Sequence, residues 1–333
     1  MKKSKLLITF LLIVIFSLTG CTKNLEGADG KVVKNEVTGQ VLPSNILCAP
    51  TDPEIIEIYN QTREDLIKKY KKDYKAGDLS KKEYKKKVER TIDINELSAC
   101  KDFNLTSNGY TGIWTKLFVE PLAWILIKIG QFVKNYGLSI IFVTLLIRLI
   151  MYPITLKTAK QSENLKKVQP KLAKIEKKYA NKTDQESMMK KSQELMLLYK
   201  ENDINPMSGC LYSLIQIPLF FAFYEAIYRL PVLFEDSLLG YELSMSPIKG
   251  MSSGNWLYLI LPILVFLATY FSFKLNSGAS MSADQAKQTS MMMNIMMVMI
   301  FVMSFSMSTG IILYWITNNS FTIIQNLIVK RRK

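Results

Sequence analysis

Five apolar stretches, each close to the roughly 20 residues that a helix needs to cross a bilayer, set the strongest limit on this fold. They cover residues 136–155, 209–229, 255–275, 289–307 and 309–328. Backbone groups inside lipid must be hydrogen-bonded within their own segment, so such stretches are expected to be helical. The chain of 333 residues is also 49% hydrophobic. The sequence therefore predicts an all-α polytopic membrane protein.

Positive charge gathers between and after these stretches, and its placement predicts the topology. Residues 156–208 carry twelve lysines and no arginine, and the tail at residues 329–333 is also basic. Lysine and arginine are retained on the cytoplasmic side of membrane proteins. An odd number of spans then puts the N-terminal part outside and the C-terminus in the cytoplasm. Because the lysines flank apolar stretches, the net charge of +15 predicts membrane flanks and no DNA partner.

The absence of histidine and the spacing of the four cysteines restrict the chemistry of the chain. Without histidine there is no imidazole general base, catalytic triad or imidazole metal site. The four cysteines have no Cys-x-x-Cys spacing, which argues against a zinc site. We therefore expect no imidazole-based catalysis, no metal and no cofactor.

The N-terminal residues have the layout of a secretion signal. Residues 1–20 combine a lysine-rich start with an apolar core, and Leu18-Thr19-Gly20-Cys21 resembles a bacterial lipobox. Cleavage before Cys21 would leave a lipid-anchored (diacylglycerol- and palmitate-bearing) N-terminus outside the cytoplasmic membrane, in agreement with the lysine distribution. An uncleaved signal anchor with an incidental cysteine is the alternative.

Residues 21–110 are predicted to form an extracytoplasmic tether and a small helical region. The part up to residue 52 has little periodicity and is interpreted as the tether. Residues 52–90 have apolar positions at helical spacing and predict a helical hairpin that turns near Gly77. Cys48 and Cys100 bracket this hairpin, so they are either a disulfide or two free thiols.

Two further segments are predicted to be amphipathic helices outside the spans. Residues 111–135 mix apolar and lysine positions, which predicts an interfacial helix that Pro121 divides into two pieces. Residues 156–208 predict a cytoplasmic helical hairpin with an apolar stripe and a capping box that begins at Thr183. A long, basic hairpin of this kind suits transient contact with a ribosome, a nascent chain or anionic lipid.

Arg148 is the one charged residue inside the first apolar stretch. A guanidinium at bilayer depth is costly, and it usually faces a hydrated cavity or a partner. The alternative is snorkelling, but Lys157 follows nine positions later, at about 13 Å along a helix. We therefore interpret Arg148 as a functional, cavity-facing residue.

Further polar residues lie in the first, second and fifth stretches. Thr144 and Gln216 interrupt apolar runs, and the fifth stretch places four polar side chains on one helical face. These four are Trp315, Asn318, Thr322 and Gln325. Such a face either lines a hydrated groove or supplies interhelical hydrogen bonds that hold the bundle together. Four such groups beside an intramembrane arginine favour the groove.

From about residue 110 to residue 333 the sequence resembles the YidC/Oxa/Alb family of membrane protein insertases, in its Gram-positive lipoprotein type. Four motifs in order carry the resemblance: Ile-Arg-Leu-Ile-Met-Tyr-Pro-Ile-Thr around Arg148; Gln169-Pro170-Lys171-Leu172 with Lys178-Tyr179; Asn205-Pro206-Met207-Ser208-Gly209-Cys210 leading to Gln216-Ile217-Pro218; and Gly310 to Tyr314-Trp315 with Asn318 and Gln325. The sequence departs from the family pattern at Ser308-Thr309-Gly310 and at Phe273, and its 48–100 insert is large.

The resemblance implies five transmembrane helices around a hydrophilic groove that opens to the cytoplasm. It implies that Arg148 attracts hydrophilic or acidic parts of a substrate, with Thr144, Gln216, Trp315, Asn318 and Gln325 as the other groove residues. The implied partners are nascent membrane proteins, the ribosome, the Sec translocase and membrane lipid. The implied function is insertion and folding of new membrane proteins, without bond chemistry.

Three other classes of protein fit the sequence less well. A secondary transporter predicts repeated halves with broken helices, and no internal repeat is visible here. A membrane-embedded hydrolase needs a nucleophile and a base, and Cys210 has no histidine to activate it. A purely structural lipoprotein has no need for Arg148.

Overall fold

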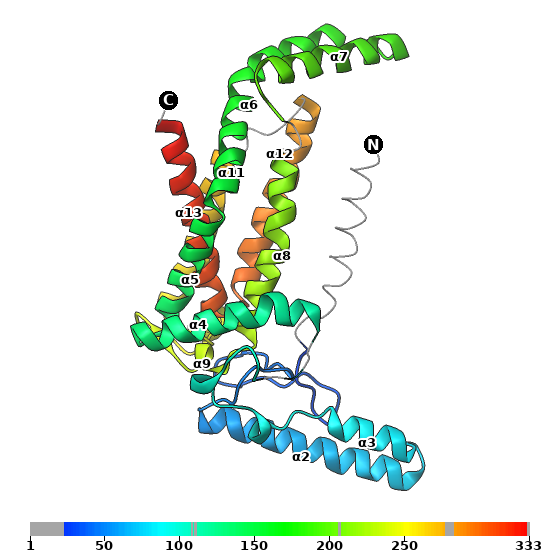
Figure 1. The fold of residues 1–333 in the computed structure, drawn as a ribbon, viewed down its shortest axis with the longest axis vertical. Coiled ribbons are helices and arrows are strands. Elements are labelled where there is room, and N and C mark those ends of the chain that lie inside the picture. Colours follow the sequence, from blue (N-terminus) through cyan, green and yellow to red (C-terminus); the bar gives the residue numbers. More distant parts are fainter. Residues whose placement is uncertain (1–22, 108, 110–111, 206–207, 277–282, 332–333) are drawn as a thin grey trace. The chain divides into compact units, whose positions relative to one another are not determined.

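The computed structural model describes residues 23–107, 109, 112–205, 208–276 and 283–331, and side chains are described outside 208–215, 276 and 283–290. The predicted signal peptide at residues 1–20 and the lipobox Cys21 lie outside the described residues. The described chain is mostly helical (Figure 1). It divides into two compact units, each described below by itself: the first comprises Met1–Val143, Pro218–Leu259 and Ser306–Tyr314, and the second comprises Thr144–Ile217, Ile260–Phe305 and Trp315–Lys333.

The first unit contains a helical hairpin. Its arms are α2 (Pro53–Ala76) and α3 (Lys81–Glu89), which lie side by side (Figure 1). The Asp52 side chain caps α2 by accepting a hydrogen bond from the amide of Glu54. Gly77 ends α2 with a positive φ of 86°, a backbone conformation that favours glycine. The turn therefore falls where the sequence contains its helix-breaking glycine.

Residues 23–50 differ from the predicted tether, because they pack against this hairpin. Leu25, Leu42 and Ile46 are buried together with Tyr59 of α2 and Ile94. The segment is held by backbone bonds such as that from the amide of Leu25 to the carbonyl of Leu42, at 2.7 Å. These apolar residues are too widely spaced to form a helical or strand pattern, so periodicity gave no signal for their burial. Short 3₁₀ turns, η2 (Ile94–Glu96) and η3 (Cys100–Asp102), complete this part.

Cys48 and Cys100 form a disulfide in the first unit, with their Cα atoms 4.8 Å apart. Both side chains are buried, at 0% and 1% exposure. The bond joins the segment before α2 to the turn that follows the hairpin, so it closes residues 48–100 of the module at residues 23–107 into one covalent loop.

The predicted interfacial helix is continuous across Pro121, which corrects the expectation of two pieces. A π-helical turn, η4 (Thr115–Val119), leads directly into α4 (Glu120–Val133). Pro121 is the second residue of α4 and adjoins the π-helical turn, where the i→i−4 hydrogen-bond pattern is already interrupted, so the helix continues although proline has no amide to donate. The exposed apolar side chains of this segment are Ile113, Leu117, Phe118, Trp124 and Phe132.

The remaining elements of the first unit connect the long helices. They are α9 (Pro231–Phe234), the two-stranded antiparallel ladder of β1 (Ser237–Leu238) and β2 (Tyr241–Glu242), α10 (Pro247–Ser252) and η5 (Trp256–Leu259). Three long helices run from one unit into the other: α5 (Tyr136–Ile150), α8 (Ser208–Tyr228) and α13 (Thr309–Arg331).

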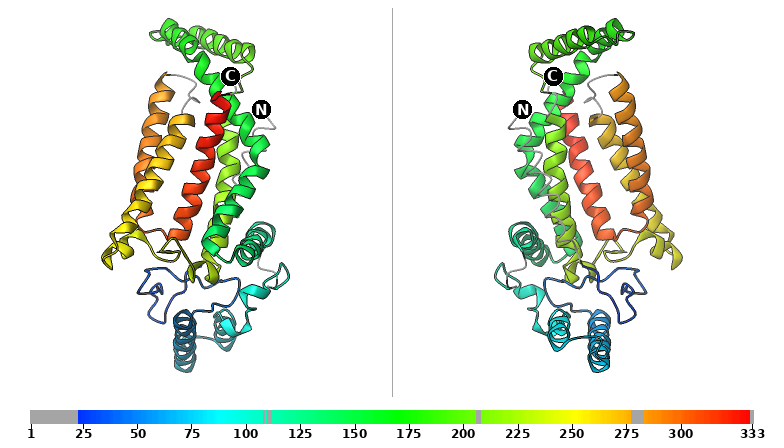
Figure 2. Two further views of the ribbon diagram at one scale, coloured as in Figure 1. Left: turned by 90° about the vertical axis from the view of Figure 1, so that its left-hand side faces the viewer. Right: turned by 90° about the vertical axis from the view of Figure 1, so that its right-hand side faces the viewer.

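The second unit contains a long hairpin of α6 (Tyr152–Tyr179) and α7 (Gln185–Glu201). The C-terminal half of α6 lies antiparallel to α7 (Figure 1). Its apolar stripe packs Leu165, Val168 and Leu172 of α6 against Leu198 and Tyr199 of α7. Helix α7 begins one residue later than the predicted capping box, because Asp184 is the residue that accepts from the amide of Ser187. The second unit also holds α11 (Ile260–Asn276) and α12 (Ala283–Ser304), which lie side by side (Figure 2).

Among the described residues, one helical stretch, Trp256–Leu275, is both long and apolar enough to cross a bilayer. A second span arises if α5 and α6, which meet at a 69° bend, are counted together. The apolar part of α12, Met291–Ser304, is shorter than a bilayer-crossing helix. Helix α13 contains several amides and hydroxyls, which lower its mean hydropathy. The helical class of the fold is thus confirmed, and the five spans stay a prediction.

Candidate functional site

Arg148 lies in the last turn of α5, and its side chain is buried in the second unit. Only 3% of the residue is exposed. Its Nε donates a hydrogen bond of 2.6 Å to Oδ1 of Asn318, which lies half-buried on α13. Helix α5 ends two residues later, at Ile150, before the bend into α6. The guanidinium is therefore held near a helix end and points at an amide rather than along α5 towards Lys157.

The polar face of α13 makes hydrogen bonds to two further helices of the same unit. The indole Nε1 of Trp315 donates to Oγ1 of Thr269 on α11, at 3.0 Å. Ten positions along α13, Nε2 of the buried Gln325 donates to Oγ1 of Thr155 on α6, at 2.7 Å. Contacts of this kind are what interhelical bonding predicts. The face thus fixes α13 against α6 and α11 and brings Asn318 to Arg148.

Two other predicted site residues occupy the same unit. Thr144 lies one helical turn before Arg148 on α5 and is 2% exposed. Gln216 lies half-buried on α8. Thr322, one turn after Asn318, is also buried and donates from its hydroxyl to the carbonyl of Asn318 at 3.1 Å. The structure thus pairs Arg148 directly with Asn318, and it gives Trp315 and Gln325 partners that were not among the predicted site residues.

Those partners, Thr155 and Thr269, were missed by the sequence analysis. Both are buried, and Ser272 on α11 is buried as well. A single threonine in an apolar helix gives little signal, because its hydroxyl can bond to its own backbone four residues earlier. The sequence analysis accordingly placed polar site residues in the first, second and fifth apolar stretches only, although the third carries the acceptor for Trp315.

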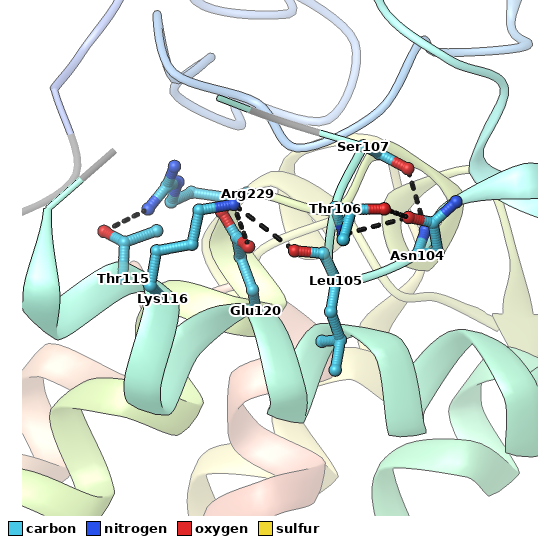
Figure 3. A network of polar contacts seen from close by, with 8 residues as sticks. All are labelled: Asn104, Leu105, Thr106, Ser107, Thr115, Lys116, Glu120 and Arg229. Atoms are coloured by element: carbon cyan, nitrogen blue, oxygen red, sulfur yellow. Dashed lines mark hydrogen bonds and ion pairs between the residues drawn. The ribbon is translucent and has the colours of Figure 1, made fainter. Parts of the chain in front are cut away.

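A second polar cluster, which lies in the first unit, is built on charged residues. Arg229 is 3% exposed and lies 3.7 Å from Oε2 of Glu225, which is 2% exposed. Its Nε donates to the carbonyl of Asn45 at 2.7 Å. Its Nη1 donates to Oγ1 of Thr115 at 3.4 Å (Figure 3). The indole of Trp114 donates to the other oxygen of Glu225, at 3.1 Å.

The neighbouring turn of η4 and α4 adds a second ion pair to this cluster. Nζ of Lys116 lies 2.8 Å from Oε2 of Glu120, a residue that is 1% exposed (Figure 3). The same Nζ donates to the carbonyl of Leu105 at 3.4 Å. The cluster of Lys116, Glu120, Glu225 and Arg229 therefore ties the module at residues 23–107 to α4 and to the end of α8.

This buried cluster was also missed, although the sequence carries a signal for it. Glu225 and Arg229, like Lys116 and Glu120, are four positions apart, the spacing that puts opposite charges on one helical face. Such pairs are usually exposed and contribute little. Their burial depends on the packed segment around Asn45, which has no periodicity to predict it.

The described residues contain no group of three or more histidine, cysteine, aspartate or glutamate side chains placed to hold a metal ion. What the Arg148 site offers is a buried positive charge next to a half-buried amide. Such an arrangement attracts polar or negatively charged groups.

Comparison with known proteins finds one family model and several similar proteins. The model, described as 60Kd inner membrane protein, matches residues 128–333. The membrane protein insertase YidC of Oceanobacillus iheyensis is 37% identical over 242 residues, which cover 71% of this chain and 91% of that protein. The membrane protein insertase MisCA of Bacillus subtilis is 36% identical over 218 residues, which cover 65% of this chain and 79% of MisCA.

Among solved structures, a crystal structure of an active YidC insertase with its first transmembrane domain resolved is similar to this chain. The two are 26% identical, with a TM-score of 0.44. The match covers 80% of this chain and 52% of the solved one, so the chain spans about half the length of that protein.

Proposed function

This chain belongs to the YidC family of membrane protein insertases, and from that premise we propose that it inserts newly made proteins into a bacterial cytoplasmic membrane and helps them fold. It does so through a hydrophilic groove lined by six side chains. These are Thr144, Arg148, Gln216, Trp315, Asn318 and Gln325. The groove binds and releases substrate without bond chemistry, so the protein is a chaperone for membrane insertion and not an enzyme.

The proposed layout has five spans, with the groove open to the cytoplasm and closed outside. The basic hairpin of α6 and α7 and the tail that follows α13 then lie in the cytoplasm, where lysine and arginine are retained. The N-terminus is outside and is anchored through lipid on Cys21.

The observation that carries the proposal is the burial of Arg148 next to Asn318. Arg148 is 3% exposed, and its hydrogen-bond acceptor, Asn318 on α13, is half-buried. A substrate carboxylate that reaches the guanidinium can replace the neutral amide, because it adds the attraction of opposite charges and can accept two parallel hydrogen bonds. Arg148 is thus the residue that draws the polar tail of a substrate towards the middle of the membrane.

Two physical terms favour acidic tails in this mechanism. A charge at the bilayer centre costs at least about 2.5–3.5 kcal/mol, and a hydrated groove with a positive charge lowers that cost. Once the tail leaves the groove, the membrane potential favours outward movement of a negative charge by about 2.3 kcal/mol per 100 mV.

The apolar segment of the substrate then leaves along the exposed face of α12. That face is rich in methionine, with Met291, Met292, Met299 and Met303 between 49% and 61% exposed. Methionine has a flexible, polarisable side chain that adapts to different apolar surfaces. A methionine face therefore suits an insertase that accepts helices of varied sequence.

The proposed partners follow from the placement of charge. The α6–α7 hairpin is basic and presents exposed Met188, Met189 and Met196, a combination that suits a ribosome or a nascent chain. The Sec translocase and membrane lipid are the other proposed partners, and nascent membrane proteins are the substrates.

The test is insertion of a single-span substrate with an acidic N-terminal tail into liposomes that contain the purified protein. Arg148→Ala should reduce insertion roughly tenfold, the effect of losing about 1.4 kcal/mol of attraction. Arg148→Lys should keep part of the activity, because it keeps the charge. A substrate whose tail aspartates are changed to asparagine is the matched control, and its insertion should depend much less on Arg148.

Each pattern of results has a distinct meaning. Loss for the acidic tail alone supports attraction by the groove charge. Equal loss for both tails makes Arg148 a structural residue, and unchanged insertion removes it from the mechanism. Failure of the unaltered protein with both substrates would contradict insertion by this chain acting alone.

A further inference from the structure

An open hollow of about 340 Å³ lies in the first unit, between the α2–α3 hairpin and the segment that follows the predicted lipobox. One wall is formed by Asn24 and the turn around Gly27 and Gly30. This wall is held in place, because Nζ of Lys69 on α2 donates to the carbonyl of Ala28 at 2.7 Å. The shape of the hollow is therefore fixed by contacts within the module at residues 23–107.

The lining of the hollow contains both basic and apolar side chains. Lys69, Lys87 and Arg90 line it, together with Glu26 as the acid. Nζ of Lys87 lies 5.1 Å from the centre of the Tyr70 ring, which is also in the lining. Leu66 and Ile92 are half-buried in the same surface. Three cations against one acid, above apolar side chains, suit a ligand with an anionic head and an apolar body.

The surrounding hairpin strengthens this charge. Between residues 66 and 90 the sequence has eleven lysines and arginines and four acids. This excess of seven positive charges lies on the side of the membrane that the topology predicts to be outside. Basic side chains close to an anionic membrane surface attract its lipids.

The length of the chain before the hollow selects the source of the anion. Asn24, which lines the hollow, follows Cys21 by three residues, and three residues span at most about 11 Å. With lipid on Cys21, as proposed above, the mouth of the hollow stays within that distance of the membrane surface. Phospholipid headgroups are then the most concentrated phosphate within reach.

We propose that this hollow binds the phosphate headgroup of an anionic phospholipid in the outer leaflet. Lys69, Lys87 and Arg90 hold the phosphate, and Leu66 and Ile92 contact the glycerol and the start of the acyl chains. The site rests on the proposed lipid anchor for its position, and it is independent of the groove around Arg148. It would fix the orientation of the module at residues 23–107 on the membrane.

The experiment measures amide hydrogen exchange in the full chain, purified in a zwitterionic detergent, on addition of dihexanoyl phosphatidylglycerol. The readout is local, because peptides that cover residues 24–30, 66–70 and 87–92 contain most of the lining of the hollow. We expect exchange there to slow several-fold with this lipid and not with dihexanoyl phosphatidylcholine. Inorganic phosphate at the same concentration should give little protection.

Two charge-matched triple variants separate a site from general attraction. Lys69→Gln, Lys87→Gln and Arg90→Gln together should weaken lipid binding roughly tenfold or more. Lys72→Gln, Lys75→Gln and Lys82→Gln remove the same charge from exposed positions of the hairpin and should leave binding within about twofold. Arg90→Gln alone, also at an exposed position, should give a smaller loss and covers the case in which the triple variant does not fold.

Three outcomes would overturn the proposal: no protection in the unaltered protein, equal weakening by the two triple variants, or equal protection by inorganic phosphate. None of them affects Arg148-dependent insertion, which is measured separately in liposomes. Failure of the lipid site and failure of the proposed insertase function are thus distinguishable.

Discussion

Arg148 and Arg229 are buried to the same extent, at 3% exposure, but they have partners of different kinds. Arg229 lies beside the carboxylate of Glu225 and donates to a backbone carbonyl at Asn45. Arg148 donates to the neutral amide of Asn318, which is half-buried. One arginine thus lies beside a buried carboxylate, and the other donates to a neutral amide.

The difference teaches how the same costly residue serves two purposes. A buried ion pair is held rigidly, because removal of either member leaves an uncompensated charge. A buried arginine with a neutral amide partner can exchange that partner at a smaller cost. The cluster around Arg229 therefore suits a structural joint between the module at residues 23–107 and α8, and Arg148 suits reversible binding.

The largest expected effect is on stability, and it tests this comparison directly. Arg229→Met should lower the free energy of unfolding by about 3–5 kcal/mol, because Glu225 is left buried without its partner. Arg148→Met should cost less, about 1.5–3 kcal/mol, the value of a hydrogen bond to a charged group. Unfolding of both variants in detergent, followed by circular dichroism against denaturant, measures the difference.

The control for that experiment is the double variant Arg229→Met with Glu225→Gln. It should recover part of the loss, because no buried charge is left alone in the pair. If the two single variants lose the same stability, the partners of the two arginines do not differ in the way proposed here.

The helices were predictable from the sequence, and their ends were only partly so. The turn at Gly77 and the stripe from Leu165 to Leu172 follow from residue type and 3.6-residue spacing. The bend after Ile150 was not predicted, since the apolar run continues through it into α6. The packing of residues 23–50 was missed as well, because their burial depends on contacts with α2 and on the disulfide.

The candidate site was predictable in its charges and amides but not in its pairings. An arginine and a polar face inside apolar stretches can be recognised from the sequence, because polar and charged residues are costly inside a membrane and therefore rare there. Which groups meet is decided by helix packing: Gln325 meets Thr155, and Trp315 meets Thr269. Threonine is common in apolar helices, so neither partner was distinguishable from its neighbours.

A smaller effect is expected where both partners are buried and neutral. Gln325→Leu and Thr155→Val should each destabilise the protein, and the double variant should lose less than the sum of the two. The coupling should be about 1 kcal/mol, the net value of an intramolecular hydrogen bond. A double-mutant cycle of unfolding in detergent measures it. A coupling as large as that of Arg229 with Glu225 would show that charge does not separate the two clusters.

The smallest effect is expected at an exposed pair of the α6–α7 hairpin, where solvent screens the charges. Glu194 accepts hydrogen bonds from Lys178 and Tyr179, which lower its pKa below the usual 4.5, and the bond to Glu194 raises the pKa of Lys178 above 10.5. The contact is therefore complete between these values. It weakens as the pH falls through the lowered pKa of Glu194, or rises through the raised pKa of Lys178.

Amide hydrogen exchange in α6 and α7 measures this dependence against Glu194→Gln at each pH. The two proteins should differ slightly at pH 7 and converge as the pH falls through the lowered pKa of Glu194, where this side chain loses its charge. A difference that persists at low pH would assign the contact to the shape of the side chain and not to its charge. The stabilities contributed by the pairs Arg229–Glu225, Gln325–Thr155 and Lys178–Glu194 would then follow their burial alone. The contrast between Arg148 and Arg229 would need another cause.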